Sequence, residues 1–229
     1  MHDPLWLRAF LWGHIAAGGG AFVLAPLALL TAKGGRAHRR WGLFYFWCMA
    51  TVAGTALVMA LYRPILFLAL VAIFSFYSAF VAYRVLGQKA AYTGRQTVQP
   101  LDWSAAIACF AACAVLVILG IVRPHLVSGL RYPAIVFGAI GMRISGGAMW
   151  KFLHPPKEKM FWWYAHLQGM IGSYIAAWTA FCVVTIGPRL GPGSWWIWLL
   201  PTAIGVPCII ATTAYYKRKF TPRVKAAAA

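Results

Sequence analysis

The stretch 103-WSAAIACFAACAVLVILGIV-122 is 20 residues long and contains no charged side chain. An α-helix rises about 1.5 Å per residue, so about 20 apolar residues are needed to cross a hydrocarbon core of about 30 Å. This stretch therefore predicts a transmembrane helix. The rest of the chain agrees, since 62% of the 229 residues are hydrophobic, 10% are charged and the mean hydropathy is +0.71. Soluble domains are only about half apolar, so the composition indicates a polytopic membrane protein.

Six further stretches have comparable length and apolar character. The weakest is 133-152, because Arg143 lies at its centre and glycines dilute it. We expect an all-α, polytopic transmembrane seven-helix bundle that forms one domain over residues 1-225, with the four alanines 226-229 as an appended tail outside it. The seven predicted helices cover residues 5-30, 41-61, 65-86, 103-122, 133-152, 161-186 and 195-216.

Basic residues far outnumber acidic ones, with 21 Lys and Arg against three Asp and Glu and a net charge of +18. With seven spans, most of these basic residues fall on one side of the membrane, and six or eight spans would remove that bias. By the positive-inside rule the N-terminus lies outside and the C-terminus in the cytoplasm. Basic cytoplasmic loops suit anionic head groups, so membrane lipids, and no nucleic acid, are the expected partners. The sparse, outer side holds Arg8, Arg63, Arg123, Arg131 and Arg189.

Polar side chains inside the predicted helices define a candidate ligand site. Arg143 lies about ten residues into its helix, while none of the three acidic residues lies in an apolar stretch. Because intramembrane charges are costly and face bundle interiors or cavities, Arg143 should contact carbonyls, hydroxyl or amide groups, or an anionic ligand. His14 and His166 sit beside small residues and should point inward, either as hydrogen-bonded core residues or as ligand contacts. The candidate ligand-binding residues are His14, Arg143, His166, Gln168 and Tyr174.

Small residues spaced four apart form ridges that let helices approach closely in lipid. Three predicted helices carry such ridges, and we expect these helices, the first, fifth and sixth, to form the tight centre of the bundle. The ridges are Gly13, Ala17 and Ala21; Ala134, Gly138, Gly141 and Ser145; and Ala165, Gly169, Ser173 and Ala177.

A second interpretation is a site for haem b. His14 and His166 differ in predicted depth by about 9 Å at a rise of about 1.5 Å per residue, which is too far for the axial pair of one haem. The other two candidates, at the cytoplasmic ends of helices, are closer in depth to His166. The candidate cofactor-binding residues are therefore His38, His154 and His166, for haem b or another metal centre, with quinone as a redox partner.

Several function classes lack the residues that they need. The last predicted helix, 195-216, has no lysine for a retinal Schiff base, and the spans have no carboxylates for a proton relay. We find no HExxH motif, Walker loop or paired glycosidase carboxylates, which argues against hydrolytic enzymes. All five cysteines fall within predicted helices, where a free thiol usually acts as a small apolar group.

The first hairpin, 13-GHIAAGGGAFVLAPLALLTAKGGRAHRRWGLFYF-46, resembles a family of uncharacterised bacterial multi-pass membrane proteins with a domain of unknown function. The family pattern is a first-helix His, a Gly-rich run ending in Gly-Pro, and a loop closing in His-Arg-x-x-Gly. Here Ala25 replaces the glycine of the Gly-Pro pair. A second similar segment is 161-FWWYAHLQGMIGSYIAAWTAF-181, with His166 and Ser173. The resemblance implies a bacterial cytoplasmic (inner) membrane location. The matching positions of the first hairpin are His14, Gly18, Pro26, Arg36, His38, Arg39 and Gly42.

The first functional hypothesis is a binding or accessory protein that holds a lipid, quinone, pigment or haem-like ligand near Arg143 and His14, as a subunit of a larger membrane complex. The second is a b-type haem electron-transfer protein that acts on quinone. The third is a small-molecule transporter, which should show paired interrupted helices in two repeats. Only the last helix, with Pro201 and Pro207, is clearly interrupted. The pattern leaves open whether the chain catalyses a reaction.

Overall fold

The computed structural model describes residues 4–62, 65–95, 97–128, 130–191 and 193–220, and every regular element in these ranges is helical. Seven helices have between 19 and 27 residues in the described part of the chain. Short helical turns fill the connections: η1 (Val85–Gly87), η2 (Lys89–Thr93), η3 (Pro124–Val127), α7 (Gly187–Leu190) and η4 (Trp195–Trp198). The long helices are α1 (Leu5–Leu30), α2 (Arg36–Tyr62), α3 (Leu66–Arg84), α4 (Pro100–Val122), α5 (Arg131–Leu153), α6 (Phe161–Thr185) and α8 (Leu200–Phe220).

Each of the seven predicted stretches is helical, which confirms the all-α prediction. The first coincides with α1 at both ends. The seventh is divided, because the 3-10 turn Trp195–Trp198 precedes α8, which contains Pro207. The boundaries of the other helices differ from the predicted ones by a few residues, since helix ends depend on caps and loop contacts rather than on apolar length.

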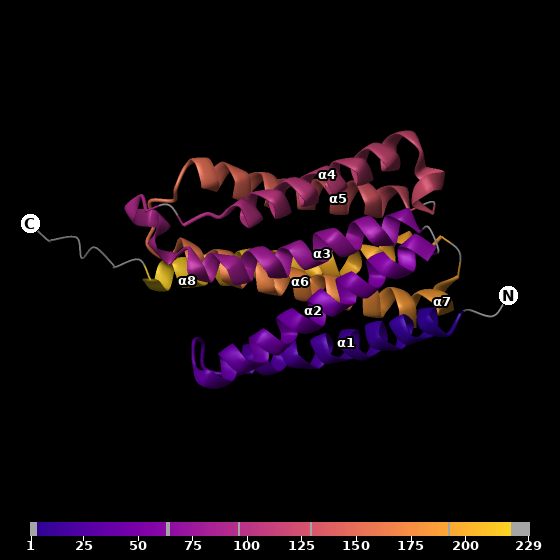
Figure 1. The fold of residues 1–229 in the computed structure, drawn as a ribbon, viewed down its shortest axis with the longest axis horizontal. Helices are drawn as coiled ribbons and strands as arrows, with labels where there is room; N and C mark the ends of the chain where they lie inside the picture. Colours follow the sequence, from indigo (N-terminus) through magenta and orange to yellow (C-terminus); the bar gives the residue numbers. More distant parts are fainter. Residues whose placement is uncertain (1–3, 63–64, 96, 129, 192, 221–229) are drawn as a thin grey trace, which may run out of the picture.

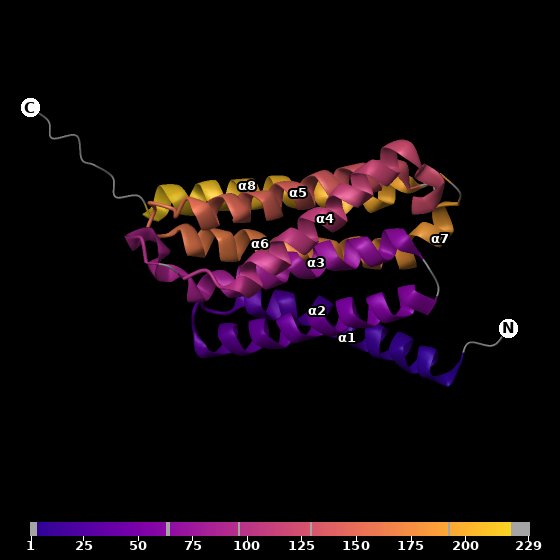
Figure 2. The same ribbon diagram turned by 45° about the horizontal axis from the view of Figure 1, so that its top comes forward.

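Two helical hairpins flank a central group of helices (Figure 1). One hairpin is α1 packed along α2, and the other is α4 packed along α5. Between them, α3 packs against α6, and α6 also packs against α8. Helix α3 contacts α2 on one side and α4 on the other, so it joins the two hairpins. The turned view separates α1 and α2 from α5 and α8, with α3 and α6 between them (Figure 2).

Glycine faces mark the close helix contacts. A Cβ added at Gly138 of α5 would lie 2.6 Å from Cγ2 of Val117 and 2.7 Å from the carbonyl oxygen of Cys113, both in α4. A Cβ added at Gly169 of α6 would lie 2.7 Å from the Cβ of Ala82 in α3. At both places the absence of a side chain lets two backbones approach.

The prediction that the first, fifth and sixth helices form the tight centre is wrong. The ridge of α5 faces α4 and the ridge of α6 faces α3, while α1 packs mainly on α2. A small-residue ridge shows which face of a helix can approach a neighbour closely. It does not show which neighbour fills that face, because that depends on the connections and on the complementary surfaces.

Six helices of the described chain are long and apolar enough to cross a membrane, which gives the chain the build of a multi-pass membrane protein. Helix α5 has 23 residues and is long enough, but it is less apolar than these six helices. The reason is its composition, since Arg131, Arg143 and Lys151 lie in it together with several glycines. The fifth predicted span is therefore confirmed as a helix but not as a span.

Candidate functional site

A cavity of about 1350 Å³ runs through the bundle, lined by side chains of α1, α2, α3, α5, α6 and α8. One part is lined by residues of α1 and α2, and another by residues of α5, α6 and α8, while α3 also contributes to the lining. Its lining is mostly apolar, and among the described residues that line it none is an aspartate or a glutamate. Small-molecule sites usually have about 300–1000 Å³, so this cavity has room for a large apolar or amphipathic molecule.

Arg143 is an exposed residue in the middle of α5 and lines this cavity. Within the described residues it makes no hydrogen bond or ion pair. No described hydroxyl or amide group accepts a hydrogen bond from it. The Ser145 hydroxyl donates to the Gly141 carbonyl at 2.7 Å, and the Tyr174 hydroxyl donates to the Phe22 carbonyl at 3.2 Å. The charge of Arg143 is therefore directed at the cavity rather than at a partner in the described chain.

Lys151 lies two turns beyond Arg143 on α5 and lines the same cavity. Its charge is repelled by Arg143 and by Lys217 of α8. The Lys217 ammonium nitrogen also lies 3.9 Å from an oxygen of the Glu158 carboxylate and is positioned over the Tyr164 ring. This part of the cavity is thus positively charged along α5.

Gln168 is a polar residue of α6 that lines the same cavity as Arg143 and Lys151. Its amide nitrogen donates to the Thr213 hydroxyl of α8 at 3.2 Å. This bond ties α6 to α8 and fixes the orientation of the amide. Gln168 and Arg143 therefore line one cavity without bonding each other.

His14 lies in the other part of the cavity, between α1 and α2. Its Nδ1 is 3.1 Å from the Val52 carbonyl oxygen and 3.0 Å from the Thr55 hydroxyl. Because the Thr55 hydroxyl donates to the Thr51 carbonyl at 2.6 Å, it accepts from His14, whose Nδ1 carries the proton. The ring is thus anchored to α2, as expected of an inward-facing histidine, and its role toward a ligand stays a prediction.

His38 and His166 are brought together from α2 and α6, with ring centroids 6.2 Å apart and planes at 73°. The Nδ1 of His38 donates to the Ala28 carbonyl, and that of His166 donates to the Ala82 carbonyl, each at 2.9 Å. A carbonyl only accepts, so in the neutral rings both Nε2 atoms keep their lone pairs. Metal-bound histidines commonly have this arrangement.

The expected trio of His38, His154 and His166 does not form. His154 stacks on Trp150 at 4.0 Å and points its Nδ1 at the Trp150 carbonyl, 3.2 Å away. In the part of the chain that the structure describes, no three His, Cys, Asp or Glu side chains could hold one metal ion. The expectation used depth along the membrane alone, and depth does not fix the position of a side chain around the bundle.

Tyr174 is not part of the cavity lining. Its hydroxyl donates a hydrogen bond to the Phe22 carbonyl of α1, and its ring lies near the rings of Phe22 and Trp178. Of the five predicted ligand-binding residues, the cavity therefore brings together His14, Arg143 and Gln168. The other two, His166 and Tyr174, bond to neighbouring helices instead.

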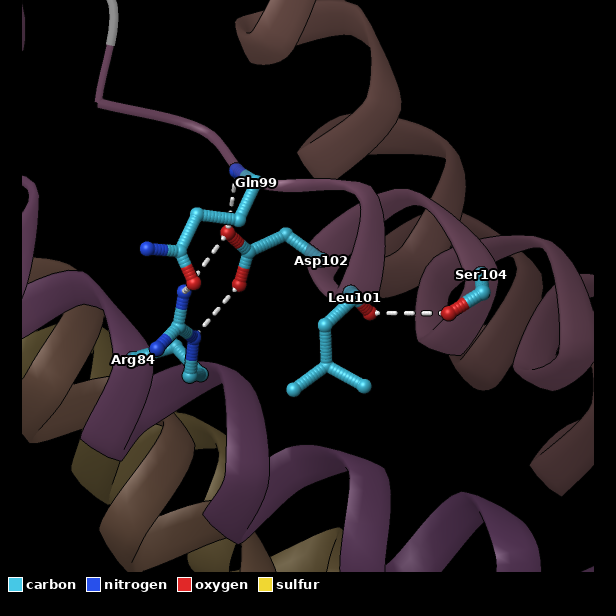
Figure 3. Close-up of polar contacts among 5 residues, drawn as sticks. All are labelled: Arg84, Gln99, Leu101, Asp102 and Ser104. Atoms are coloured by element: carbon cyan, nitrogen blue, oxygen red, sulfur yellow. Dashed lines mark hydrogen bonds and ion pairs between the residues drawn. The ribbon is translucent and has the colours of Figure 1, made fainter.

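The sequence interpretation missed a polar cluster at the start of α4 (Figure 3). Arg84, at the end of α3, binds both oxygens of the Asp102 carboxylate at 2.7 and 3.0 Å, and also the Gln99 side-chain oxygen at 2.7 Å. Asp102 accepts from the Gln99 backbone N–H at 2.8 Å, which completes a capping box on α4. The signal was the spacing in 99-QPLD-102, in which a polar residue, a proline and an acidic residue three positions later mark a helix start.

Neither the models of protein families nor the sequences of curated proteins nor the solved structures contain a match to this chain. The cavity along α5 combines apolar walls with two cations, whereas the charge of Arg84 is paired with Asp102 within its own cluster.

Proposed function

We propose that this chain is a seven-span protein of the bacterial cytoplasmic membrane that holds an amphipathic molecule, such as a lipid, a quinone or a pigment, in its central cavity. The distribution of Lys and Arg over the loops supports seven spans, with an outer N-terminus and a cytoplasmic C-terminus. Helix α5 then crosses the membrane too, with its apolar face along α4 and its charged face toward the cavity.

The observation that carries this proposal is the cavity of about 1350 Å³, whose walls are mostly apolar with a few polar groups. Such pockets are the usual form of sites for small molecules. Helices in lipid gain stability from close packing, so a large interior space between α5, α6 and α8 is costly unless a molecule fills it. The absence of acidic groups from the described lining favours binding over acid–base catalysis.

Filling the cavity tests the proposal. Gly172 lines the cavity and a Cβ there would meet no atom within 4 Å, so Gly172→Leu should fit and occupy ligand space. Gly54 of α2 is the matched control, because it has equal room and does not line the cavity. Mass spectrometry of a solvent extract should find a molecule bound in stoichiometric amount to wild type and Gly54→Leu, and depleted from Gly172→Leu. An extract that contains only the bulk lipids of the membrane, in all three proteins, would contradict the proposal.

A second candidate function is electron transfer through a haem b held by His38 and His166. Two imidazole nitrogens at about 2.0–2.1 Å from one metal centre stand about 4 Å apart, which places their ring centroids about 6 Å apart. The observed separation is 6.2 Å. The two histidines do not line the cavity, however, so a porphyrin would need additional space around them.

A reduced-minus-oxidised absorption spectrum of gently purified protein tests this second function. A Soret band with reducible α and β bands that disappears in His166→Ala, and persists in His154→Ala, would support the haem pair. A spectrum without these bands would set haem aside and leave the amphipathic ligand. Protein partners retained in the same mild detergent would support a role as a subunit of a larger complex, and a clean monomer would count against it.

A further inference from the structure

We infer that the molecule in the cavity is an acidic amphiphile, whose anionic head group binds between Arg143 and Lys151 and whose hydrocarbon part lies along α6 and α8. This inference rests on the proposed function and names the class of its ligand. The charges of α5 define this class.

Arg143, Gly147 and Lys151 are spaced four residues apart and all line the cavity. The two cations are about 12 Å apart along the helix at about 1.5 Å per residue. A Cβ at Gly147 would meet no atom within 4 Å, so the space between the two cationic side chains is open. Long Arg and Lys side chains reach several ångströms along a helix surface, so both can converge on one group that lies over Gly147.

Neither cation is compensated within the described residues. Arg143 and Lys151 make no hydrogen bond or ion pair there, and each repels the other. The nearest described carboxylate of the adjacent loop, Glu158, pairs with Lys217. Two uncompensated cations beside an apolar cavity are costly, and an anion between them replaces repulsion by two charge-assisted hydrogen bonds.

The remaining walls select a ligand with an apolar body. Beyond the two cations the cavity continues along Ile140, Ile144, Ile175 and Val206. A free inorganic anion would leave this apolar volume empty, whereas a hydrocarbon tail fills it. Lys151 lies near the Leu153 end of α5, which the seven-span topology assigns to the cytoplasmic side, and Arg143 lies at the middle of the helix. The head group is a phosphate or a carboxylate, and it enters from that leaflet.

Thermal unfolding of the full chain in neutral detergent tests the inference. Dioleoyl phosphatidylglycerol and oleate supply the two anionic head groups, dioleoyl phosphatidylcholine supplies the same tails with no net charge, and inorganic phosphate supplies the anion alone. Wild type should gain about 5–10 °C at lipid about 100-fold above its dissociation constant, with either phosphatidylglycerol or oleate. Phosphatidylcholine should bind at least about tenfold more weakly, and inorganic phosphate should give no shift.

Three variants locate the effect. Arg143→Gln and Lys151→Gln should each weaken binding of the anionic lipid about tenfold, because each removes one charge-assisted bond. Arg131→Gln is the matched control, since Arg131 is an exposed cation of α5 that does not line the cavity, and it should bind as wild type does. If Arg143→Gln does not fold, Arg143→Lys, which keeps the charge, and Lys151→Gln together carry the same comparison.

The outcomes separate this inference from the proposed function. Equal stabilisation by phosphatidylglycerol and phosphatidylcholine, or full anion selectivity in both Gln variants, overturns the acidic head group while the cavity remains a ligand site. A shift with inorganic phosphate as large as that with the lipid overturns the amphiphile. No stabilisation by any amphiphile, together with a Gly172→Leu variant that behaves as wild type, contradicts the proposed function itself.

Discussion

Arg84 and Arg143 both lie on helices of this bundle, but only Arg84 is paired with a carboxylate of the described chain. Arg84 binds Asp102 through two hydrogen bonds and Gln99 through a third, and Asp102 is only 3% exposed. Arg143 makes no hydrogen bond or ion pair within the described residues and lines a cavity of about 1350 Å³. The first arginine is part of a closed structural contact, and the second is directed at whatever occupies the cavity.

The difference shows that residue type is a weak guide to the role of a charge on such a helix, because both residues are arginines. A paired arginine next to a helix start stabilises the fold by joining α3 to α4. An arginine with no protein partner contributes little to the fold and can respond to a ligand. Substitutions should therefore affect unfolding most at the paired arginine and least at the arginine beside the cavity.

Asp102→Ala should have the largest effect. It leaves Arg84 next to the helix start without its carboxylate and removes the cap of α4, so the free energy of unfolding should fall by about 3 kcal/mol. Denaturant or thermal unfolding in detergent measures this loss. Glu158→Gln is the control, because its pair with Lys217 is half exposed at 3.9 Å and should contribute less than about 1 kcal/mol. An equal loss of unfolding free energy in both variants would show that the buried Arg84–Asp102 pair is no more stabilising than an exposed pair.

Gly138→Val should destabilise by about 1–3 kcal/mol, because the added side chain overlaps Val117 and the Cys113 carbonyl of α4. This contact holds one face of α5 against α4 and so leaves Arg143 toward the cavity. Gly147→Ala, where a Cβ meets nothing within 4 Å, should be neutral or slightly stabilising through helix propensity. The two variants are compared by their unfolding midpoints. A tolerated Gly138→Val would show that α4 does not fix α5.

Tyr45→Phe tests a neutral buried contact between these extremes. The Tyr45 hydroxyl and the Ser173 hydroxyl are 2.7 Å apart and both residues are buried, so the bond joins α2 to α6. Interhelical bonds of this kind in membrane proteins contribute about 0.6–1 kcal/mol. Unfolding in detergent should show a loss of that size, with Tyr132→Phe, an exposed residue at the start of α5, as an unaffected control. The Ser173 hydroxyl also donates to the Met170 carbonyl at 2.9 Å, so no loss in Tyr45→Phe would mean that this second bond alone satisfies Ser173.

Arg143→Gln should have the smallest effect, with the free energy of unfolding in neutral detergent unchanged to within about 0.5 kcal/mol. The variant removes no described protein contact, and it relieves the repulsion between Arg143 and Lys151, so any small change should be toward greater stability. The same variant should lose most of the stabilisation that anionic lipid gives to wild type. A loss of several kcal/mol without lipid would show that Arg143 is a structural residue like Arg84.

The sequence was a good guide to the helices and a poor guide to their partners. Apolar length located all seven long helices, and the spacing in 99-QPLD-102 would have located the capping box of α4. Small-residue ridges identified faces that do pack closely, at Gly138 and Gly169, but assigned them to the wrong neighbours. The Tyr174 hydroxyl donates to the Phe22 carbonyl of α1, a contact between distant helices that sequence spacing within one helix could not reveal.

By itself the sequence determined that this protein is helical, multi-pass and strongly basic, because these properties depend on the length of apolar runs and on composition. Only the tertiary structure decided which charges are satisfied. It placed Arg84 against Asp102 across 18 positions, joined His38 to His166 and left Arg143 beside a cavity. The physical reason is that a side chain's partners depend on the rotation and pairing of whole helices, which short-range sequence patterns do not specify.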